Sequence, residues 1–507
     1  MNKPADARVS VEKIPLWIDG KHLTPNVARW GEVTNPATGA IIRRVPFCAA
    51  GEIDAAVRAA QNALPGWAGT SPLRRSRVMQ KFMELMQRNQ QALARLVTEE
   101  NGKTLTDAVG SVQRGLEVAE FACGIPQLLK GEYSENVGPA VDSFSIRQPV
   151  GVCAGITPFN FPVMVPMWMA PMAIACGNTF ILKPSEKDPS PSVMIAELLK
   201  EAGLPDGVFN VVQGDKESVD AILSHPGISA VSFVGSTPIA KYIYEQSARH
   251  GKRVQALGGA KNHAVVLPDA ELDFTADAII GAAYGAAGER CMAISAVVAV
   301  GGIGDAIVGK IKERAQKIMV GPGDKEGIDM GPLVTAAHRD KVASYIDAGV
   351  REGARLVVDG RNVNIPGYER GFYLGTTLFD RVKPEMSIYR DEIFGPVLSV
   401  LRADTVDEAI KVVNANPYGN GTAVFTNSGG AARRFYEEVN VGMVGVNVPI
   451  PVPMAFFSFG GWKSSLFGDL HVHGAEGVRF YTRTKQVTAR WPRQDTPAPG
   501  FNIPTLG

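Results

Sequence analysis

The stretch Ala230-Val-Ser-Phe-Val-Gly-Ser-Thr-Pro-Ile-Ala-Lys241 combines a strand and the start of a helix, joined by a short turn. Residues 230–234 have the apolar character of a strand, and Gly235 opens the turn. The residues from Ser236 onward favour a helix. A strand that leads directly into a helix is the repeating unit of α/β proteins.

The same alternation continues on both sides of this stretch. In the first half we expect strands at 149–156, 178–183 and 208–212 and helices at 50–62, 72–101, 104–123 and 191–202. The helix over 104–123 is expected to begin with Thr106 and Asp107 as capping residues. After Gly258-Gly259 we expect strands at 264–267 and 296–300 and helices at 272–288 and 304–319. The pattern predicts two α/β domains, the first with the doubly wound order of nucleotide-binding proteins.

The composition is that of an ordinary globular protein. The chain has 507 residues, of which 45% are apolar and 20% charged, and this is long enough for several domains. A formal net charge of +1 gives no electrostatic reason to expect a nucleic-acid or acidic-membrane partner. Residues 148–182 carry no charge but contain five prolines, so we expect a strand, a loop and a short helix there, and no membrane span.

The cysteines are widely and irregularly spaced and form no CxxC pair. They are Cys48, Cys123, Cys153, Cys176 and Cys291. This spacing predicts neither a metal site nor a disulfide framework, and an odd number in a long chain fits a reducing compartment. The start, MNKPADARVS, has neither the apolar core of a signal peptide nor an Arg-rich amphipathic pattern. We therefore expect a cytoplasmic protein, with a Pro-rich, extended tail from Pro492 onward.

Cys291 is the first candidate for chemistry. It lies in Gly285-Ala-Ala-Gly-Glu-Arg-Cys-Met-Ala-Ile-Ser295, among small residues and directly after Arg290. The nucleophilic form of cysteine is the thiolate, whose formation an adjacent cation or a helix N-terminus would favour. The small neighbours leave room for a substrate. From these residues alone, Cys291 is either a nucleophile or a buried structural cysteine.

Two turns are candidates for binding a nucleotide. Gly235 and the hydroxyls after it could hold a pyrophosphate at a helix N-terminus, although Ala240 stands where the GxGxxG pattern has a glycine. In Lys183-Pro-Ser-Glu186, the lysine and the glutamate could bind ribose hydroxyls. The alternatives are an ordinary strand-to-helix turn and a surface turn.

Two further segments have a functional and a structural interpretation. Asn160, in Thr157-Pro-Phe-Asn-Phe-Pro162, carries an amide that could donate to a developing oxyanion, or that could satisfy its own turn. Glu392-Ile-Phe-Gly-Pro396 places a carboxylate and an aromatic ring before a turn. The structural alternative for this segment is a turn whose phenylalanine packs in the core.

Together, these segments resemble the aldehyde dehydrogenase superfamily, from Trp17 to about Trp491. The motifs TPFNFP, KPSE, FVGST, LGG, GERC and EIFGP occur in that family's order and approximate spacing. The resemblance implies an aldehyde dehydrogenase-like α/β fold. It has a Rossmann-type NAD-binding domain, an α/β catalytic domain and a small β oligomerisation domain. Their expected boundaries are 1–127 with 148–257, 258–450, and 128–147 with 478–491. The resemblance also implies a homotetramer built from dimers.

The resemblance assigns roles to individual residues. Cys291 becomes the nucleophile, and Asn160 together with the backbone N–H of Cys291 holds the oxyanion. Glu186 binds the adenosine ribose with Lys183 and should repel a 2′-phosphate, so NAD is expected as the cofactor rather than NADP. Glu392 binds the nicotinamide ribose. The remaining expected cofactor contacts are Thr157, Phe159, Lys187, Gly235, Ser236, Gly258 and Phe394.

One departure from the family pattern concerns water. Hydrolytic members carry Glu-Leu-Gly-Gly, whose glutamate activates the water that cleaves the acyl-enzyme. Here Ala256 occupies its place, in Val254-Gln-Ala-Leu-Gly-Gly-Ala-Lys-Asn-His263. Alanine cannot accept a proton, so another nucleophile should release the acyl group. A thiol such as coenzyme A needs no comparable base.

Other segments resemble the coenzyme A-acylating methylmalonate-semialdehyde dehydrogenases. They are GGAKNH, GERCMA, the block 457–469 and Ser111-Val-Gln-Arg-Gly-Leu-Glu117. This resemblance assigns Arg114 and Arg290 to a substrate carboxylate, which arginine pairs with bidentately. From the pattern alone, Arg114 could be a solvated helix residue paired with Glu117, and Arg290 could act only on the thiol pKa.

The expected activity follows from the resemblance. It is NAD-dependent oxidative decarboxylation of methylmalonate or malonate semialdehyde to propionyl-CoA or acetyl-CoA, through a thioester on Cys291. The sequence does not decide which of the two semialdehydes is preferred. It also does not decide whether the enzyme serves the breakdown of valine, inositol or β-alanine. One alternative is a hydrolytic dehydrogenase for another small aldehyde, with Glu289 as the base. A second is a non-catalytic binding or structural protein on the same scaffold.

Overall fold

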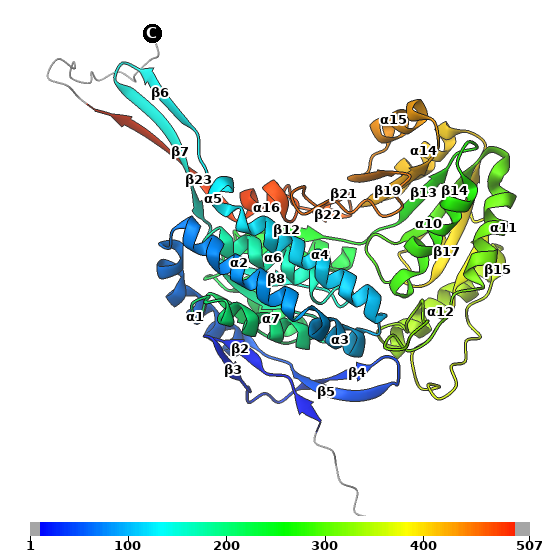
Figure 1. Cartoon of the computed structure of the whole chain (residues 1–507), viewed down its shortest axis with the longest axis horizontal. Coiled ribbons are helices and arrows are strands. Elements are labelled where there is room, and N and C mark those ends of the chain that lie inside the picture. Colours follow the sequence, from blue (N-terminus) through cyan, green and yellow to red (C-terminus); the bar gives the residue numbers. More distant parts are fainter. Residues whose placement is uncertain (1–10, 492–507) are drawn as a thin grey trace, which may run out of the picture.

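The computed structural model describes residues 11–491, which form two large α/β units and a projecting arm (Figure 1). The first unit contains an eight-stranded sheet. In spatial order its strands are β22 (Leu466–Phe467), β12 (Arg253–Leu257), β11 (Ala230–Val234), β8 (Val152–Ile156), β9 (Thr179–Lys183), β10 (Phe209–Val211), β2 (Leu16–Ile18) and β3 (Lys21–Leu23). The strands from β12 to β10 are parallel. The chain starts this parallel set at β8 and winds outward in both directions, which confirms the doubly wound α/β prediction.

Helices cover both faces of this sheet, because its parallel strands are apolar on both sides. Every residue of β8, β9 and β11 is buried. Val152 and Ala154 pack into one core, while Cys153 between them packs into the other. The first core includes α1 (Ala50–Ala68), α8 (Lys216–Ser224) and α9 (Thr237–Arg249). The second includes α2 (Pro72–Arg88), α3 (Gln90–Asn101), α4 (Leu105–Cys123), α6 (Met164–Ala175) and α7 (Ser190–Glu201).

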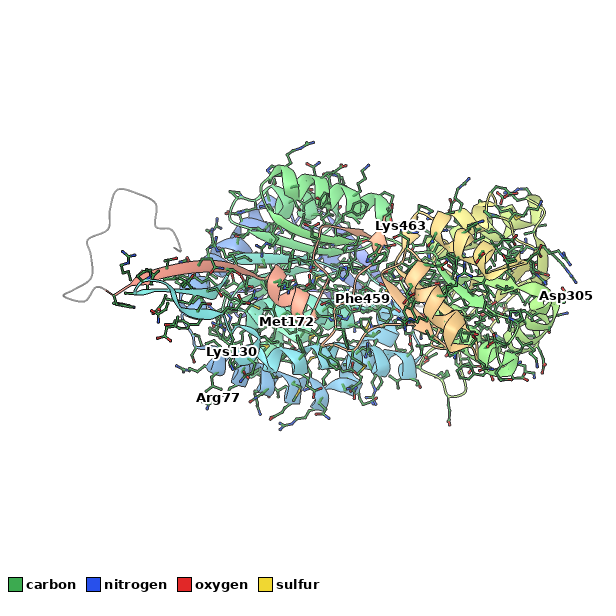
Figure 2. All side chains as sticks on the ribbon, turned by 90° about the horizontal axis from the view of Figure 1, so that it is seen from above. Arg77, Lys130, Met172, Asp305, Phe459 and Lys463 are labelled. Atoms are coloured by element: carbon green, nitrogen blue, oxygen red, sulfur yellow. The ribbon has the colours of Figure 1, made fainter. Side chains whose placement is uncertain are left out.

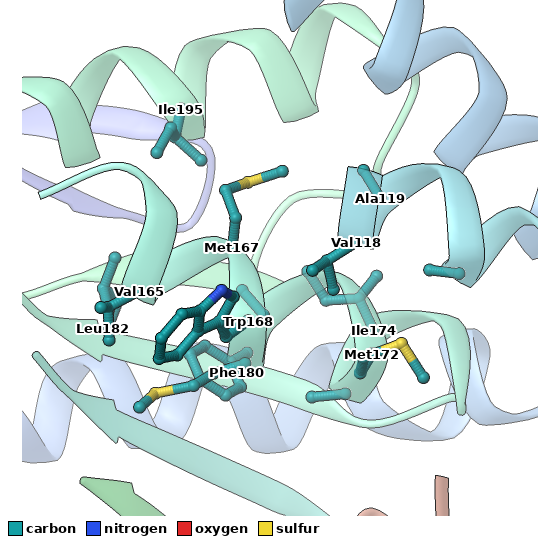
Figure 3. Packing of buried hydrophobic residues seen from close by; sticks show 14 of the residues in the cluster. Val118, Ala119, Val165, Met167, Trp168, Met172, Ile174, Phe180, Leu182 and Ile195 are labelled. Carbon is teal, nitrogen blue, oxygen red and sulfur yellow. The ribbon is translucent and has the colours of Figure 1, made fainter. Parts of the chain in front are cut away.

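The uncharged segment 148–182 forms the centre of the second core. It comprises β8, a loop, α6 and the start of β9, as predicted, and all residues of α6 are buried. Figure 3 shows Trp168 and its neighbours on α6 packed among Val118, Phe180 and Ile195. The lack of charge therefore reflects burial inside the protein. Among residues 11–491, no helix combines the length and the apolar character that crossing a membrane requires.

The second unit contains a seven-stranded sheet with its own core. In spatial order its strands are β15 (Arg355–Val358), β16 (Thr377–Asp380), β17 (Val397–Ala403), β14 (Ile294–Val300), β13 (Asn262–Val266), β19 (Gly421–Phe425) and β20 (Met443–Val446). Only β15 runs antiparallel to its neighbour. The helices of this unit include α10 (Leu272–Tyr284), α11 (Gly304–Ala315), α12 (Ala336–Arg351), α14 (Val406–Ala415) and α15 (Gly429–Glu438).

The arm is a three-stranded antiparallel sheet that extends away from the first unit (Figure 1). It consists of β6 (Tyr133–Gly138), β7 (Val141–Pro149) and β23 (Thr482–Arg490), which follows α16 (Gly474–Phe480). Val150 and Gly151 alone separate β7 from β8, so the arm continues directly into the central strand of the first sheet. A separate three-stranded sheet near the N-terminus consists of β1 (Glu12–Lys13), β5 (Ala40–Pro46) and β4 (Trp30–Asn35).

The segment between β20 and α16 connects the two units. Phe459 and Lys463, labelled in Figure 2, lie on it. The Phe459 ring packs on Trp168 of α6 with ring centroids 4.6 Å apart, and Lys463 Nζ donates to the Asn416 carbonyl at 2.7 Å in the second unit. Both units are therefore tied to one short stretch of chain.

Several predicted helix boundaries are wrong. The helix expected over 72–101 is two helices, α2 and α3, because the side-chain amide of Asn89 donates to the Leu85 carbonyl at 2.9 Å and ends the first. The cap of α4 is Thr104, whose hydroxyl accepts from the Asp107 N–H at 3.3 Å, rather than Thr106 or Asp107.

The two helices expected in the second unit end early. The helix expected over 272–288 ends at Tyr284, since Ala286 and Ala287 have positive φ. The one expected over 304–319 ends at Ala315. The predictions about the first ten residues and the tail from Pro492 concern residues outside the described range.

Candidate active site

Cys291 lies in the turn before β14, between two cavities that it helps to line. One cavity has a volume of about 460 Å³ and is lined mainly by the ends of strands of the first sheet and by residues near Glu392. The other has a volume of about 290 Å³ and is lined by one face of α4 and by α6. The thiol is therefore accessible to two different molecules from two sides.

Three asparagine amides hold the backbone around Cys291. The carbonyl of Cys291 accepts from Asn262 Nδ2 at 2.9 Å and from Asn420 Nδ2 at 3.0 Å. Asn160 Nδ2, which is buried, donates to the carbonyl of Glu289 at 3.0 Å. These amides come from β13, from the residue before β19 and from the loop after β8, so both units fix the position of the nucleophile.

The turn that precedes Cys291 has an uncommon backbone. Ala286 and Ala287 both have a φ of 52°, and Gly288 has a φ of 73°. A Cβ atom on Gly288 would lie 2.2 Å from the Gly395 carbonyl oxygen, so this position has room only for glycine. Non-glycine residues with positive φ cost free energy and often occur where function fixes the backbone.

The Cys291 thiol is neutral in this environment. Burial raises its pKa to about 12, and the nearby carboxylate of Glu392 adds to the increase. The prediction that Arg290 favours the thiolate is wrong for this structure. The guanidinium of Arg290 points to Asp107, with Nη2 at 2.5 Å from Oδ1. The pKa increase is opposed first by the backbone N–H of Cys291 and then by the Lys103 ammonium.

The larger cavity lies where a doubly wound sheet binds ligands. The chain reverses its winding direction between β8 and β11, and ligands bind at the carboxyl ends of such strands. Asn160 follows β8, and Gly235 and Ser236 follow β11, and all three line the cavity together with Gly258 and Phe159. Ser236 is exposed at the N-terminus of α9 and makes no capping bond there. Its hydroxyl and the first N–H groups of α9 suit a phosphate.

Glu392 reaches this cavity from the second unit and is held by backbone groups. Its Oε1 accepts from the Ala260 N–H at 2.8 Å. A Cβ atom on Gly259 would lie 2.2 Å from Glu392 Oε2, so the carboxylate fits only against a glycine. Burial raises the pKa of Glu392 to about 7. The buried ammonium of Lys261 supports the backbone beside it, donating to the Asp391 carbonyl at 2.9 Å.

Phe394 forms an aromatic wall with Phe159. The two rings meet edge to face at a centroid distance of 5.9 Å, and Phe394 itself has a φ of 59°. His338 Nε2 lies 2.7 Å from the Phe394 carbonyl oxygen and donates to it. His338 thereby supports the strained turn that carries Phe394.

Four expected cofactor contacts lie at the same sheet edge but outside this cavity. Lys183 ends β9, and its carbonyl accepts from the Thr157 N–H at 3.1 Å. The ammonium groups of Lys183 and Lys187 lie 3.8 Å and 2.9 Å from Glu186. Burial opposes ionisation of Glu186, but the two lysines hold its pKa below the usual range. Thr157 Oγ1 is buried and has no hydrogen-bond partner among the described residues, which leaves it free for a ligand or water.

The smaller cavity combines two arginines with an apolar wall. Asp107, Ser111 and Arg114 lie about one turn apart on one face of α4 and line it with Arg290. Each terminal nitrogen of the Arg114 guanidinium already makes one bond: Nη1 lies 2.6 Å from Glu117, and Nη2 donates to the Pro453 carbonyl at 2.7 Å. The apolar wall consists of Phe161, Met164, Trp168, Met292, Ile450 and Val452. Such a cavity suits a short, partly apolar molecule with one negative group.

No carboxylate occupies the position of Ala256. This residue is fully buried in β12, between Phe233 of β11 and Phe467 of β22. The alternative in which Glu289 serves as a base has no support in the geometry. Glu289 lines neither cavity. Its carboxylate accepts a hydrogen bond from the Val334 N–H at 3.4 Å. Burial raises the pKa of Glu289 to about 8.

Sequence reasoning missed several residues that line the two cavities. They are Asp107 in the smaller one and His338, Lys341 and Tyr418 in the larger one. His338 and Lys341 lie on α12, far from any of the six motifs, and no local pattern identifies them. Asp107 was identified only as a helix cap. The hydroxyl of Thr237, one of the two expected to hold a pyrophosphate, accepts from the Gly259 N–H at 2.7 Å.

Comparison with known proteins agrees with this geometry. The model of the aldehyde dehydrogenase family matches residues 24–487. A malonate-semialdehyde dehydrogenase of Pseudomonas aeruginosa is 56% identical over 96% of this chain and 99% of its own length. A bovine enzyme named methylmalonate-semialdehyde/malonate-semialdehyde dehydrogenase [acylating], mitochondrial, is 48% identical over 98% of this chain and 93% of its own length.

Solved structures show the same similarity. A putative methylmalonate-semialdehyde dehydrogenase of Sinorhizobium meliloti, complexed with NAD, matches with a TM-score of 0.95 and 53% identity over 96% of this chain and all of that one. Because the match in sequence and structure extends over nearly the whole chain, the chain belongs to the aldehyde dehydrogenase family.

Proposed function

We propose that this protein is an NAD-dependent, coenzyme A-acylating dehydrogenase of methylmalonate and malonate semialdehydes, with propionyl-CoA and acetyl-CoA as products. The observation that carries this proposal is the smaller cavity, in which Arg114 and Arg290 flank Cys291. A cavity with two guanidinium groups next to the nucleophile fits an aldehyde that also bears a carboxylate. The names of the relatives support the same substrate class.

Cys291 starts the reaction. The thiol first releases its proton to solvent, and the thiolate then attacks the aldehyde carbon from the junction of the two cavities. The amide of Asn160 and the backbone N–H of Cys291 stabilise the negative charge that develops on the aldehyde oxygen. NAD held at the larger cavity would supply the acceptor for the hydride that leaves the substrate carbon. The remaining acyl group is a thioester on Cys291.

The residues at the strand ends fit NAD. Ser236 at the N-terminus of α9 would contact the pyrophosphate, and Glu392 would accept from the nicotinamide ribose. Lys183 and Glu186 would hold the adenosine ribose. Because Glu186 stays ionised, it repels a 2′-phosphate, and we expect a lower catalytic efficiency with NADP than with NAD.

The acyl group leaves to a thiol. The substrate carboxylate is β to the thioester carbonyl, which can take up the electron pair released when carbon dioxide departs. Ala256 offers no base for water, whereas coenzyme A is already a good nucleophile near neutral pH. Coenzyme A is therefore the expected second substrate, and its attack regenerates the Cys291 thiol.

Assembly and location belong to the same proposal. Residues 1–127 with 148–257 are assigned to NAD binding, and 258–450 to catalysis. Residues 128–147 with 478–491, which contain most of the arm, are assigned to pairing between subunits in a cytoplasmic homotetramer. A role in valine breakdown would fit methylmalonate semialdehyde as the substrate. Light scattering on the purified protein tests the assembly: the mass of four 54.1 kDa chains is expected, and a monomer would contradict it.

The deciding experiment follows NADH formation from malonate and methylmalonate semialdehydes, with and without coenzyme A, and identifies the product by mass. We expect sustained turnover only with coenzyme A, yielding acetyl-CoA or propionyl-CoA. Turnover without it, yielding a free acid, would identify a hydrolytic enzyme instead. If no aldehyde gives NADH, the result would favour a non-catalytic protein instead.

A further inference from the structure

Three charged side chains form a chain at the smaller cavity, and two of them, Asp107 and Arg290, line it. Asp107 Oδ2 is 3.3 Å from Lys103 Nζ, and Asp107 Oδ1 is 2.5 Å from Arg290 Nη2. The side chain of Lys103 is 2% exposed, and its ammonium lies 4.2 Å from the centroid of the Phe161 ring, which lines the cavity. One half-buried carboxylate thus bridges two cations beside the nucleophile.

We propose that Asp107 is a positioning residue that fixes the Arg290 guanidinium toward the substrate carboxylate, with Lys103 as its counter-ion. This inference rests on the proposed function, in which Arg290 binds that carboxylate. We assign Asp107 no contact with the reacting atoms or the cofactor. It acts through Arg290, and its effect is on recognition of the charged end of the substrate.

The geometry restricts Arg290 from two further sides. Nη1 donates to the Gly281 carbonyl at 3.3 Å, and the guanidinium lies over Gly285, where a Cβ atom would come within 2.4 Å of Nη1. Among the described residues, the bonds to Gly281 and Asp107 use two of the five N–H groups of Arg290 and leave three for a ligand. An arginine held in this way loses little entropy when it binds a carboxylate.

The charges of the five residues Lys103, Asp107, Arg114, Glu117 and Arg290 sum to one positive charge. Arg114 and Glu117 form a pair at 2.6 Å and cancel. Asp107 cancels one of its two cations and leaves the other for a ligand. Without Lys103, the region would be neutral and Arg290 would be fully compensated by Asp107. The cluster therefore matches a monoanion such as a semialdehyde that bears one carboxylate.

A local structural role for Asp107 is the competing explanation. Its N–H donates to Thr104 in the first turn of α4, where an acidic side chain also stabilises the helix. A structural role predicts the same change for every aldehyde. A positioning role predicts a change confined to aldehydes that carry a carboxylate.

The test compares KM and kcat for malonate semialdehyde and for propanal, which lacks the carboxylate, in the complete enzyme with NAD and coenzyme A. In Asp107→Asn we expect KM for the semialdehyde to rise about tenfold or more, with kcat and the constants for propanal changed less than about twofold. Removal of a negative charge alone would lower KM for an anion. The sign of the change therefore separates positioning from net charge.

Two further variants complete the design. The double variant Lys103→Met with Asp107→Asn restores the net charge but not the bridge, so KM should stay high. Recovery of a normal KM in it would show that only charge matters. Glu120→Gln removes an exposed carboxylate from the same helix and should leave both aldehydes unaffected.

The outcome for Arg290→Gln separates this inference from the proposed function. If it raises KM for the semialdehyde while Asp107→Asn does not, the positioning role is refuted and the function stands. If wild-type enzyme does not oxidise the semialdehyde, the proposed function fails first. Equal losses with propanal and the semialdehyde in Asp107→Asn would assign Asp107 to stability.

Discussion

The side-chain amide of Asn160 donates a hydrogen bond across 3.0 Å to the backbone carbonyl of Glu289, two residues before the nucleophile. Asn160 belongs to the loop after the central strand of the first sheet, and Glu289 to the turn of the second unit. This bond uses one N–H of the amide and leaves the other available for an oxyanion. The orientation of the amide is therefore set before any substrate binds.

Replacement of Asn160 should affect the chemical step. We expect Asn160→Ala to lower kcat by about 100- to 1000-fold, because it removes one oxyanion donor. KM should change little, since the amide stabilises charge that develops only in the transition state. Steady-state kinetics measures both constants. A large rise in KM with a normal kcat would place Asn160 in substrate binding instead.

The Cys291 thiol should react slowly in the absence of NAD. Because its pKa is raised to about 12, the thiolate fraction should grow about tenfold for each pH unit between about pH 7 and 9. The rate of alkylation by iodoacetamide, followed by mass spectrometry, reports this fraction. Cys291→Ala corrects for the partly exposed Cys123. A rate that levels off near neutral pH would indicate a thiolate that is already formed.

Binding of NAD should weaken in mild acid. The pKa of Glu392 is raised to about 7, so the carboxylate takes up a proton as the pH falls through that value and loses the charge that strengthens a bond to a ribose hydroxyl. We expect KM for NAD to rise from pH 8 to pH 6. In Glu392→Gln, KM should be high and nearly independent of pH over this range. An unchanged pH profile in the variant would show that another group titrates.

A methyl group at Gly259 should disturb the cofactor site without unfolding the protein. Its Cβ would lie 2.2 Å from Glu392 Oε2, so the carboxylate must move away from the Ala260 N–H. We expect Gly259→Ala to raise KM for NAD about tenfold, the cost of a displaced charged hydrogen bond. Gly309→Ala, on the exposed face of α11 with no atom nearby, is the matched control. Calorimetry should show a normal Tm for both.

The fold could be predicted from sequence because strands such as Ala230–Val234 carry an unbroken apolar pattern that only a covered parallel sheet accommodates. The break between α2 and α3 at Asn89 could not be predicted, because a single hydrogen bond from the Asn89 side chain to the Leu85 carbonyl decides it. The site was predictable where motifs surround it, as at Cys291. His338 was not, because it reaches Phe394 only through the packing of α12.

The asparagines that hold the backbone around Cys291 also bear on how long the protein stays active. Asn420 precedes Gly421, and an asparagine followed by glycine is chemically fragile, since the next backbone nitrogen can attack its side chain and convert the amide to an acid. Here the Gly421 N–H donates to Asn262 Oδ1 at 3.0 Å, which restrains that nitrogen. Conversion at Asn420 would place a carboxylate against the Cys291 carbonyl. Asn262 thus holds back the nitrogen that would attack Asn420, and the working lifetime of the nucleophile depends on this hydrogen bond.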